Sequence, residues 1–573
     1  MKFSRYKIFV LGAALLSFAS CDDFLDKNPD ERVDITNDEN KIIQLLTNGY
    51  MMYNYGYLCE FSSDNLIDNN SPHLPVNPDD PQVTSYYNLA PYERMDNEVF
   101  AFEQVRSSTS TDSPSVVWQG CYGAIAVANH ALTAINQMVE NNNGVISDKL
   151  RAARGEALLI RAYHHFLLVN IFCQAYKDET LSRQDVGVPY MTKEENTVNP
   201  SYDRGNVADV YAKIEQDLEA GLEDISDVNY AMPKWHFNVN AAHAFAARFY
   251  LFKREYDKVI EHADAVLGQG TANLSNMLMK YDGFDGCTKM DDYANVWQNP
   301  SANNNLMLLA TYSTLRRRIM GCRYAWNGDG LKNTVYHLGP NWRWYVIPCG
   351  YVSGATFYSG EQDYGYCSSK IGERFEYTDK VSGIGYAHVI RREFTATELL
   401  LERAEAKLLS QNRDIPGAVA DLIAYDTSRW TFTESDKQTF FANGALEYLT
   451  EEDMLSYYSD TNNPNCFADW DFTQNMSPGF VVPQDVVPYM NAVNDMRRYE
   501  TVLEGLRFFD LKRFGIEYSH AIGNPAEVIT LAWDDPRRAL EIPQEVEAAG
   551  MQTSRPKVTE YKQDGSALKY KSK

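Results

Sequence analysis

The stretch from Leu150 to Tyr176 constrains the fold of this chain more than any other. It reads LRAARGEALLIRAYHHFLLVNIFCQAY, and from Glu156 to Cys173 it is apolar on nearly every side of a helix. A helix of this kind lies inside a large helical protein. Its polar residues Arg154, Arg161 and His165 are seven and four residues apart, so they share one narrow stripe. A membrane span is the alternative, but two adjacent histidines and an internal arginine argue against it. We therefore predict a buried scaffold helix.

Further helices are predicted on both sides of this stretch, from three-four apolar spacing and from capping residues. They cover residues 38–50, 116–139, 206–225, 241–267 and 396–425. Asp38 is the predicted N-cap of the first segment. Asp414 is the predicted N-cap of the second helix in 396–425, and Pro416 lies in the first turn of that helix. The segments 241–267 and 396–425 each read as a helix–turn–helix pair, and YDKVIEHADAVL resembles the tetratricopeptide repeat. A long segment separates them, which indicates a scaffold with large insertions.

Charge and cysteine usage limit the possible partners. The net charge of −25 repels phosphate backbones, so we predict no nucleic-acid partner. The same acidity argues against binding of the folded body to anionic lipid. Eight cysteines follow Cys21 without a CxxC pair or a metal-ligand cluster. Pairing is open for these cysteines, and free buried thiols are favoured.

The N-terminus carries a targeting signal. Lys2, Arg5 and Lys7 precede an apolar core, and Ala19–Ser20 directly precede Cys21. A cysteine after small residues resembles the bacterial lipobox, which implies that Cys21 is lipidated and becomes the first residue of the mature chain. The alternative is an ordinary signal peptide with a chance cysteine.

Two segments have the composition of a carbohydrate site. Sugar recognition needs flat apolar faces beside amide, carboxylate or phenol groups. Residues 56–115 are interrupted by prolines and read as a long loop, and 281–395 reads as loops and short strands. If 341–345 is extended, two tryptophans share one face, with an arginine opposite. The candidate ligand-binding residues are Trp326, Asn327, Asp329, Trp342, Arg343, Trp344, Tyr345, Tyr86 and Tyr87, with Asp64, Asn65 and Tyr92 nearby. For any one tryptophan, the alternative is a place in the core.

The motif RRYETVLEGLRFFDLKRFG, from Arg497 to Gly515, resembles the E-G-x-R-F-F-D-L-x-R-x-G signature of the RagB/SusD family. The lipobox, RGEALLIRAYHHFLL, the ARFYLFKREYDKVIEHADAVL stretch and ELLLERAEAKLL each resemble that family at matching places. We expect Arg507 and Asp510 of the motif to fix helix packing. The segment 281–395 matches no family pattern, and the tail after Ile542–Pro543 departs from it.

The resemblance implies a mainly α fold, a tetratricopeptide-like helical scaffold with long loop-rich insertions. The expected organisation is a signal peptide at 1–20, a tether at 21–37, an N-terminal helical scaffold at 38–270, a loop-rich ligand-binding insertion at 271–395 and a C-terminal helical region at 396–573. It also implies a surface lipoprotein of the outer membrane that captures oligosaccharides for a SusC-like TonB-dependent transporter, without catalysis. The acidic run 22–26 looks like the surface-export tag of Bacteroidetes lipoproteins. Some members of the family bind peptides, which is the alternative.

The sequence contains no HExxH, GxSxG, Walker loop or GxGxxG constellation. We therefore predict no catalytic residue, although a glycosidase carboxylate pair, distant along the chain, is a further alternative. His164 and His165 are expected to satisfy buried polar contacts. No cofactor is predicted. The aspartates Asp282, Asp285, Asp291 and Asp292 could hold calcium, but a solvated acidic loop is favoured.

Overall fold

The computed structural model describes residues 38–555 apart from 72–74, 78–79, 85–87, 107–109, 196–201, 285, 321, 329, 331–333, 336–350, 354–364, 430–448, 460–471 and 473–475. The predicted signal peptide, the predicted lipidation site Cys21 and the predicted tether lie outside the described residues.

The N-terminal half of the scaffold consists of four main helices. They are α3 (Glu39–Leu46), α6 (Pro114–Asn141), α7 (Asp148–Phe172) and α9 (Val207–Asp224). Each begins at a side-chain cap, because an Asp, Ser or Asn oxygen accepts an amide hydrogen of the first turn. Asp38 caps α3 as predicted, but that helix ends at Leu46 and does not reach Tyr50.

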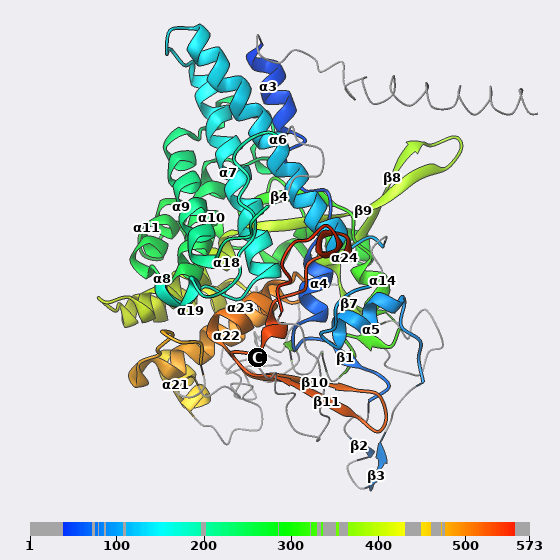
Figure 1. Cartoon of the computed structure of the whole chain (residues 1–573). Helices are drawn as coiled ribbons and strands as arrows, with labels where there is room; N and C mark the ends of the chain where they lie inside the picture. Colours follow the sequence, from blue (N-terminus) through cyan, green and yellow to red (C-terminus); the bar gives the residue numbers. More distant parts are fainter. Residues whose placement is uncertain are drawn as a thin grey trace, which may run out of the picture.

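Helix α7 is the predicted buried helix, and it packs between α6 and α9 (Figure 1). Its residues from Glu156 to Phe172 are almost all buried. The polar stripe faces α9: Arg154 pairs with Asp224 at 2.6 Å and Arg161 with Asp217 at 2.6 Å. Glycine permits the close approach, because a Cβ at Gly155 would lie 2.6 Å from the backbone nitrogen of Ile225.

The two histidines of α7 make structural contacts, as expected. His164 Nδ1 lies 2.7 Å from the Ile160 carbonyl, and its Nε2 accepts the amide of Met51 at 3.2 Å. His165 repeats the arrangement with the Arg161 carbonyl and the amide of Met191. Burial lowers the pKa of His164 to about 4, which suits a neutral imidazole in the core.

The remaining scaffold is built from helix pairs. The pair α10 (Val239–Lys253) and α11 (Tyr256–Leu267) packs against the pair α18 (Ala396–Leu409) and α19 (Ile415–Ser428), and α18 packs against α22 (Val487–Thr501). Asp414 caps α19 by accepting from the Gly417 amide. The predicted tetratricopeptide-like scaffold is confirmed. Shorter helices are α4 (Gly56–Phe61), α5 (Arg94–Phe100), α8 (Glu179–Ser182), α12 (Leu274–Met277), α13 (Met290–Trp297), α14 (Leu315–Ile319), α21 (Glu451–Ser459), α23 (Leu506–Phe514) and α24 (Gln544–Ala548).

Strands occur in small antiparallel sheets. The largest has the order β4 (Asn305–Thr311), β9 (Ile384–Thr395) and β8 (Glu373–Asp379). Beyond the paired part of β4, the β8–β9 hairpin extends away from the body (Figure 1). Two-stranded pairs are β1 (Ile67–Asp68) with β5 (Tyr324–Ala325), β2 (Pro75–Asn77) with β3 (Asp80–Thr84), β6 (Tyr351–Ser353) with β7 (Tyr366–Ser368), and β10 (Tyr518–Ile522) with β11 (Glu527–Leu531).

Both predicted loop segments are more regular than their composition indicates. The segment 56–115 contains α4 and α5, because its prolines fall between these helices. The segment 281–395 contains α13 and the 12-residue strand β9. The buried end of β9 is Arg391–Thr395, whose charged side chains are ion-paired inside the protein. A buried strand with arginines and a glutamate lacks the apolar alternation that would have identified it.

The 497–515 motif has the architectural role expected. Arg507 grips Asp64 through two contacts of 2.8 Å and reaches Asn494 at 2.8 Å. Asp510 accepts from Arg497 at 3.1 Å and from Arg513 at 2.8 Å, and Arg513 also pairs with Glu405 of α18. Asp64 is partly exposed and the other groups are buried, so the motif joins α22 and α23 to the rest of the core.

One contiguous apolar core runs from Ile42 to Ile542. Among the described residues, Cys59, Cys121, Cys173 and Cys322 are free thiols, and the first three of them are buried. Across the described residues, no helix has both the length and the apolar character needed to cross a membrane.

Candidate ligand-binding site

Strands β1 and β5 bring together the two segments with a sugar-binding composition. Ile67 lies opposite Ala325 and Asp68 opposite Tyr324, about 260 positions later in the chain. We call residues 67–71 and 322–327 the frame. The early loop and the tryptophan-rich segment therefore start from one place, although they are remote in the sequence.

A buried ion pair locks the frame. Arg323 donates through Nε to Asp68 Oδ1 at 3.0 Å and through Nη2 to Asp68 Oδ2 at 2.8 Å. Asp68 is fully buried and also accepts the amide of Gly523 at 2.9 Å, which ties the frame to the β10–β11 turn. Bidentate guanidinium–carboxylate pairs fix both distance and orientation.

Three asparagines complete the frame. Asn327 donates to Asn69 Oδ1 at 2.9 Å and accepts the amide of Gly330 at 3.0 Å. Asn70 Oδ1 accepts the amide of Leu89 at 2.7 Å, and Asn70 Nδ2 donates to the Leu89 carbonyl at 2.9 Å. Asn70 thus holds Leu89, where the chain returns to the frame, directly beside Ser71, where it leaves.

Of the predicted ligand residues, Trp326 and Asn327 are described, and both belong to the protein's own packing. Trp326 is 1% exposed and its Nε1 donates to Thr334 Oγ1 at 2.8 Å. Its ring therefore has no face open to a sugar in this structure, and the core alternative applies to it. Asn327 is also buried, and its amide is engaged within the frame.

The other predicted ligand residues lie outside the described residues: Asp329, Trp342, Arg343, Trp344, Tyr345, Tyr86 and Tyr87. The chain leaves the frame at Ser71 and returns at Asn88, and it leaves again after Asn327 and re-enters at Tyr366, whose amide donates to the Trp326 carbonyl at 2.7 Å. The first of these two segments thus begins and ends at the frame, and so does the second.

Asp64 and Asn65 are not ligand groups. Asn65 is fully buried and accepts Arg498 Nε at 3.0 Å, while Asp64 is gripped by Arg507. Burial alone raises the pKa of Asp64, but Arg498 and Arg507 outweigh burial and hold this pKa well below its usual range. Tyr92 differs: its ring is 42% exposed and lies 5.2 Å from the Arg318 guanidinium. It is an accessible aromatic surface close in sequence to the frame.

Sequence reasoning missed Arg323, Asn70 and the β10–β11 hairpin. His520 of β10 reaches the carbonyls of Phe100 and Ser63, both at 2.7 Å, and so anchors the early segment from the opposite end of the chain. The run Asp68–Asn69–Asn70 is a turn signal, but nothing local identifies its partners.

The described residues form no group of three or more His, Cys, Asp or Glu side chains that could hold a metal. Of the four aspartates considered for calcium, Asp292 accepts the amides of Thr288 and Lys289 and so caps α13, while Asp285 lies outside the described residues.

The scaffold and the frame define a class: a tetratricopeptide-like helical protein whose inserted segments are fastened together at one junction. Comparison with known proteins is more specific. Residues 23–251 match the model of a SusD-like family described as "Starch-binding associating with outer membrane". No curated protein matches the sequence.

Solved structures match nearly the whole chain. A SusD superfamily protein from Bacteroides thetaiotaomicron is similar with a TM-score of 0.56 and 17% identity, over 91% of this chain and 100% of that one. A SusD-like carbohydrate binding protein from Bacteroides vulgatus gives 0.55 and 16%, over 91% and 98%. A SusD superfamily protein from Parabacteroides distasonis gives 0.52 and 13%, over 90% and 98%. The resemblance to the RagB/SusD family is thereby confirmed: residues 23–251 carry a SusD-like sequence pattern, and the chain has the SusD fold.

Proposed function

We propose that this protein is a cell-surface glycan-binding lipoprotein that captures oligosaccharides and delivers them to a SusC-like TonB-dependent transporter. One observation carries the proposal: in the frame, Ile67 and Asp68 of β1 pair with Ala325 and Tyr324 of β5, and the chain continues from these strands to Tyr86–Tyr87 and to Trp342–Trp344 respectively. Two aromatic, amide-rich segments held at one junction suit a ligand that stacks on rings and is gripped by polar groups.

The comparisons support the same ligand class. The matching family model is described as starch-binding and associated with the outer membrane, and one similar solved structure is a carbohydrate binding protein. The lipid anchor at Cys21 and the transporter partnership belong to the proposal and follow from the resemblance, as does the absence of catalysis.

The test is a panel of polysaccharides and peptides presented to the purified mature chain. We expect binding to one class of glycan and none to the peptides. Retention of peptides alone would contradict the glycan assignment and favour a peptide importer.

Catalysis is tested on the glycan that binds. Incubation of that glycan with the protein should release no new reducing ends, because the protein holds its ligand without cleaving it. Reducing ends that increase with time and protein concentration would identify a surface glycosidase instead.

A further inference from the structure

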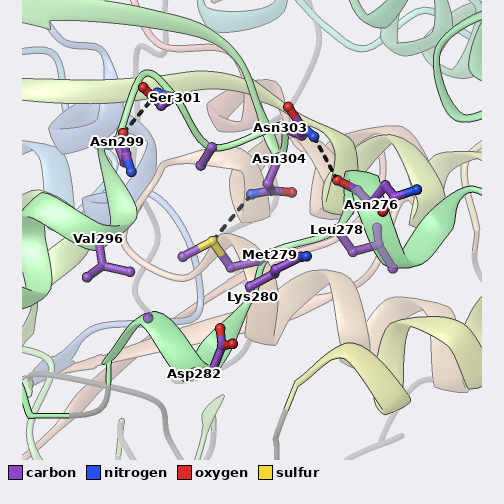
Figure 2. A pocket seen from close by; sticks show the side chains of 12 residues that line it. Asn276, Leu278, Met279, Lys280, Asp282, Val296, Asn299, Ser301, Asn303 and Asn304 are labelled. Atoms are coloured by element: carbon purple, nitrogen blue, oxygen red, sulfur yellow. Dashed lines mark hydrogen bonds between the residues drawn. The ribbon is translucent and has the colours of Figure 1, made fainter.

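A polar cavity lies on the surface apart from the frame. It measures about 330 Å³ and is walled by α12, the 281–284 turn, α13 and the loop before β4. Figure 2 shows its lining side chains. None of the lining residues belongs to the frame, and several are exposed, so the cavity opens to solvent.

The lining is rich in side-chain amides. Asn276, Asn299 and Asn303 stand at the rim with Ser301, and Leu278 and Val296 supply apolar surface (Figure 2). A carboxamide both donates and accepts hydrogen bonds, as a hydroxyl group does. Amides around a small apolar floor are therefore suited to a polyhydroxylated ring with C–H faces.

At the centre of the cavity lies a buried amide without an oxygen partner for its donor. Asn304 is 1% exposed, and its Oδ1 accepts the amide and the hydroxyl of Thr397 at 3.0 and 2.6 Å. Among the described residues, its Nδ2 contacts only the sulfur of Met279, 3.9 Å away (Figure 2). A thioether is a weak acceptor, and a buried donor left in this way carries a desolvation penalty. Met279 also lines the cavity, so a ligand oxygen that displaces its sulfur would satisfy this donor.

The cavity continues past the 278–282 segment. A second hollow of about 560 Å³ on α19 shares Leu278, Met279, Lys280 and Asp282 with it. Lys280 and Asp282 have no ion-pair partner among the described residues, so one cation and one carboxylate stand between the two hollows. Because their charges balance, a neutral ligand fits this lining better than an anion.

We propose that this cavity is a second saccharide subsite, which takes one neutral sugar residue with an oxygen on Asn304 Nδ2 and neighbouring hydroxyls on the rim asparagines. The adjoining hollow leaves room for a further residue of the same chain. The proposal rests on the proposed function for its ligand class, but it uses none of the residues assigned to the frame.

The experiment is saturation-transfer difference NMR with maltotriose, cellotriose and mannotriose, in turn, on the mature chain. Ser301→Trp fills the mouth of the cavity from an exposed position and should leave the fold intact. Asn48→Ala, an exposed asparagine of the scaffold, is the matched control. The double variant Trp342→Ala/Trp344→Ala removes the platform proposed above.

We expect at least one trisaccharide to give a signal that survives in the platform variant, falls by half or more in Ser301→Trp and disappears when the two changes are combined. Asn303→Ala, a smaller change at the rim, should reduce the signal in the same direction. A signal equal in Ser301→Trp and Asn48→Ala, and lost in the platform variant, overturns the second subsite and leaves the proposed function standing. If no trisaccharide gives a signal with the unaltered protein, the result counts against both the second subsite and the proposed function.

Discussion

Buried arginines join parts of this chain that lie far apart in sequence. Arg507 connects the C-terminal motif to Asp64 of the early segment, and its side chain is fully buried. Arg507→Met should cost about 3–5 kcal/mol, because the change leaves a largely buried carboxylate without its bidentate partner. Arg183→Ala, which breaks an exposed pair with Glu179 and Asp209, should leave the free energy of unfolding nearly unchanged, because solvent screens this pair. Urea denaturation measures both, and equal costs would contradict the structural role of the motif.

Glu402 makes stability depend on pH. Burial, together with Glu398, raises its pKa from 4.5 to about 8, although Arg497 and Arg248 act in the opposite direction at 3.9 Å. The folded chain therefore binds this proton more tightly than the unfolded chain does. The contribution of Glu402 is most favourable below about pH 4.5, declines up to about pH 8 and is constant above.

Glu402→Gln removes this titration, so its free energy of unfolding should fall less between pH 5 and pH 8 than that of the unaltered protein. The two proteins should differ least at about pH 5, where Glu402 is protonated in the folded chain. Urea titrations at both pH values measure the difference, and parallel pH profiles would show that Glu402 is ionised in the folded protein.

At the scale of elements, the helix pairs differ in how they bury their seams. Leu422 of α19 is fully buried, whereas Ile260 of α11 is half-buried. Leu422→Asp should cost about 3 kcal/mol or more, because a carboxylate enters the seam without a partner. The sequence pattern predicts the same for Ile260→Asp, but its partial exposure lowers the expected cost to about 1 kcal/mol. Thermal melting followed by circular dichroism should rank them in this order, and the reverse order would contradict the packing of these helices.

Local signals explain what the sequence could predict. The caps Asp38 and Asp414 act within three residues, and the apolar run of α7 needs no partner to be recognised. The frame depends instead on the pairing of two short strands, in which Asp68 lies opposite Tyr324. Strand β9 buries arginines, which the sequence alone would place on the surface. Trp326 is predicted as a ligand residue because composition does not distinguish a buried ring from an exposed one. Long-range contacts of this kind produce no periodic pattern of apolar and polar residues in the sequence.

At the scale of the whole molecule, the proposed function places the protein on a membrane through Cys21. The lipobox resemblance attributes this attachment to acyl chains on Cys21, and more than one chain is needed for a stable anchor. Cys21→Ala should release the protein from the membrane fraction and abolish incorporation of labelled fatty acid. Cys287→Ala, a change at a partly exposed cysteine of the folded body, should do neither. Continued labelling of Cys21→Ala would refute the lipobox assignment.

Glycan binding by the segments that continue from the frame is measured by calorimetric titration of the glycan selected from the panel. Each lost stacking ring should weaken binding by about 1 kcal/mol, so Trp342→Ala/Trp344→Ala should raise the Kd by about tenfold or more. Tyr377→Ala, an aromatic that is 52% exposed on the β8–β9 hairpin, is the control and should leave the Kd unchanged. An unchanged Kd in the double variant, with a melting temperature equal to that of the unaltered protein, would contradict the account.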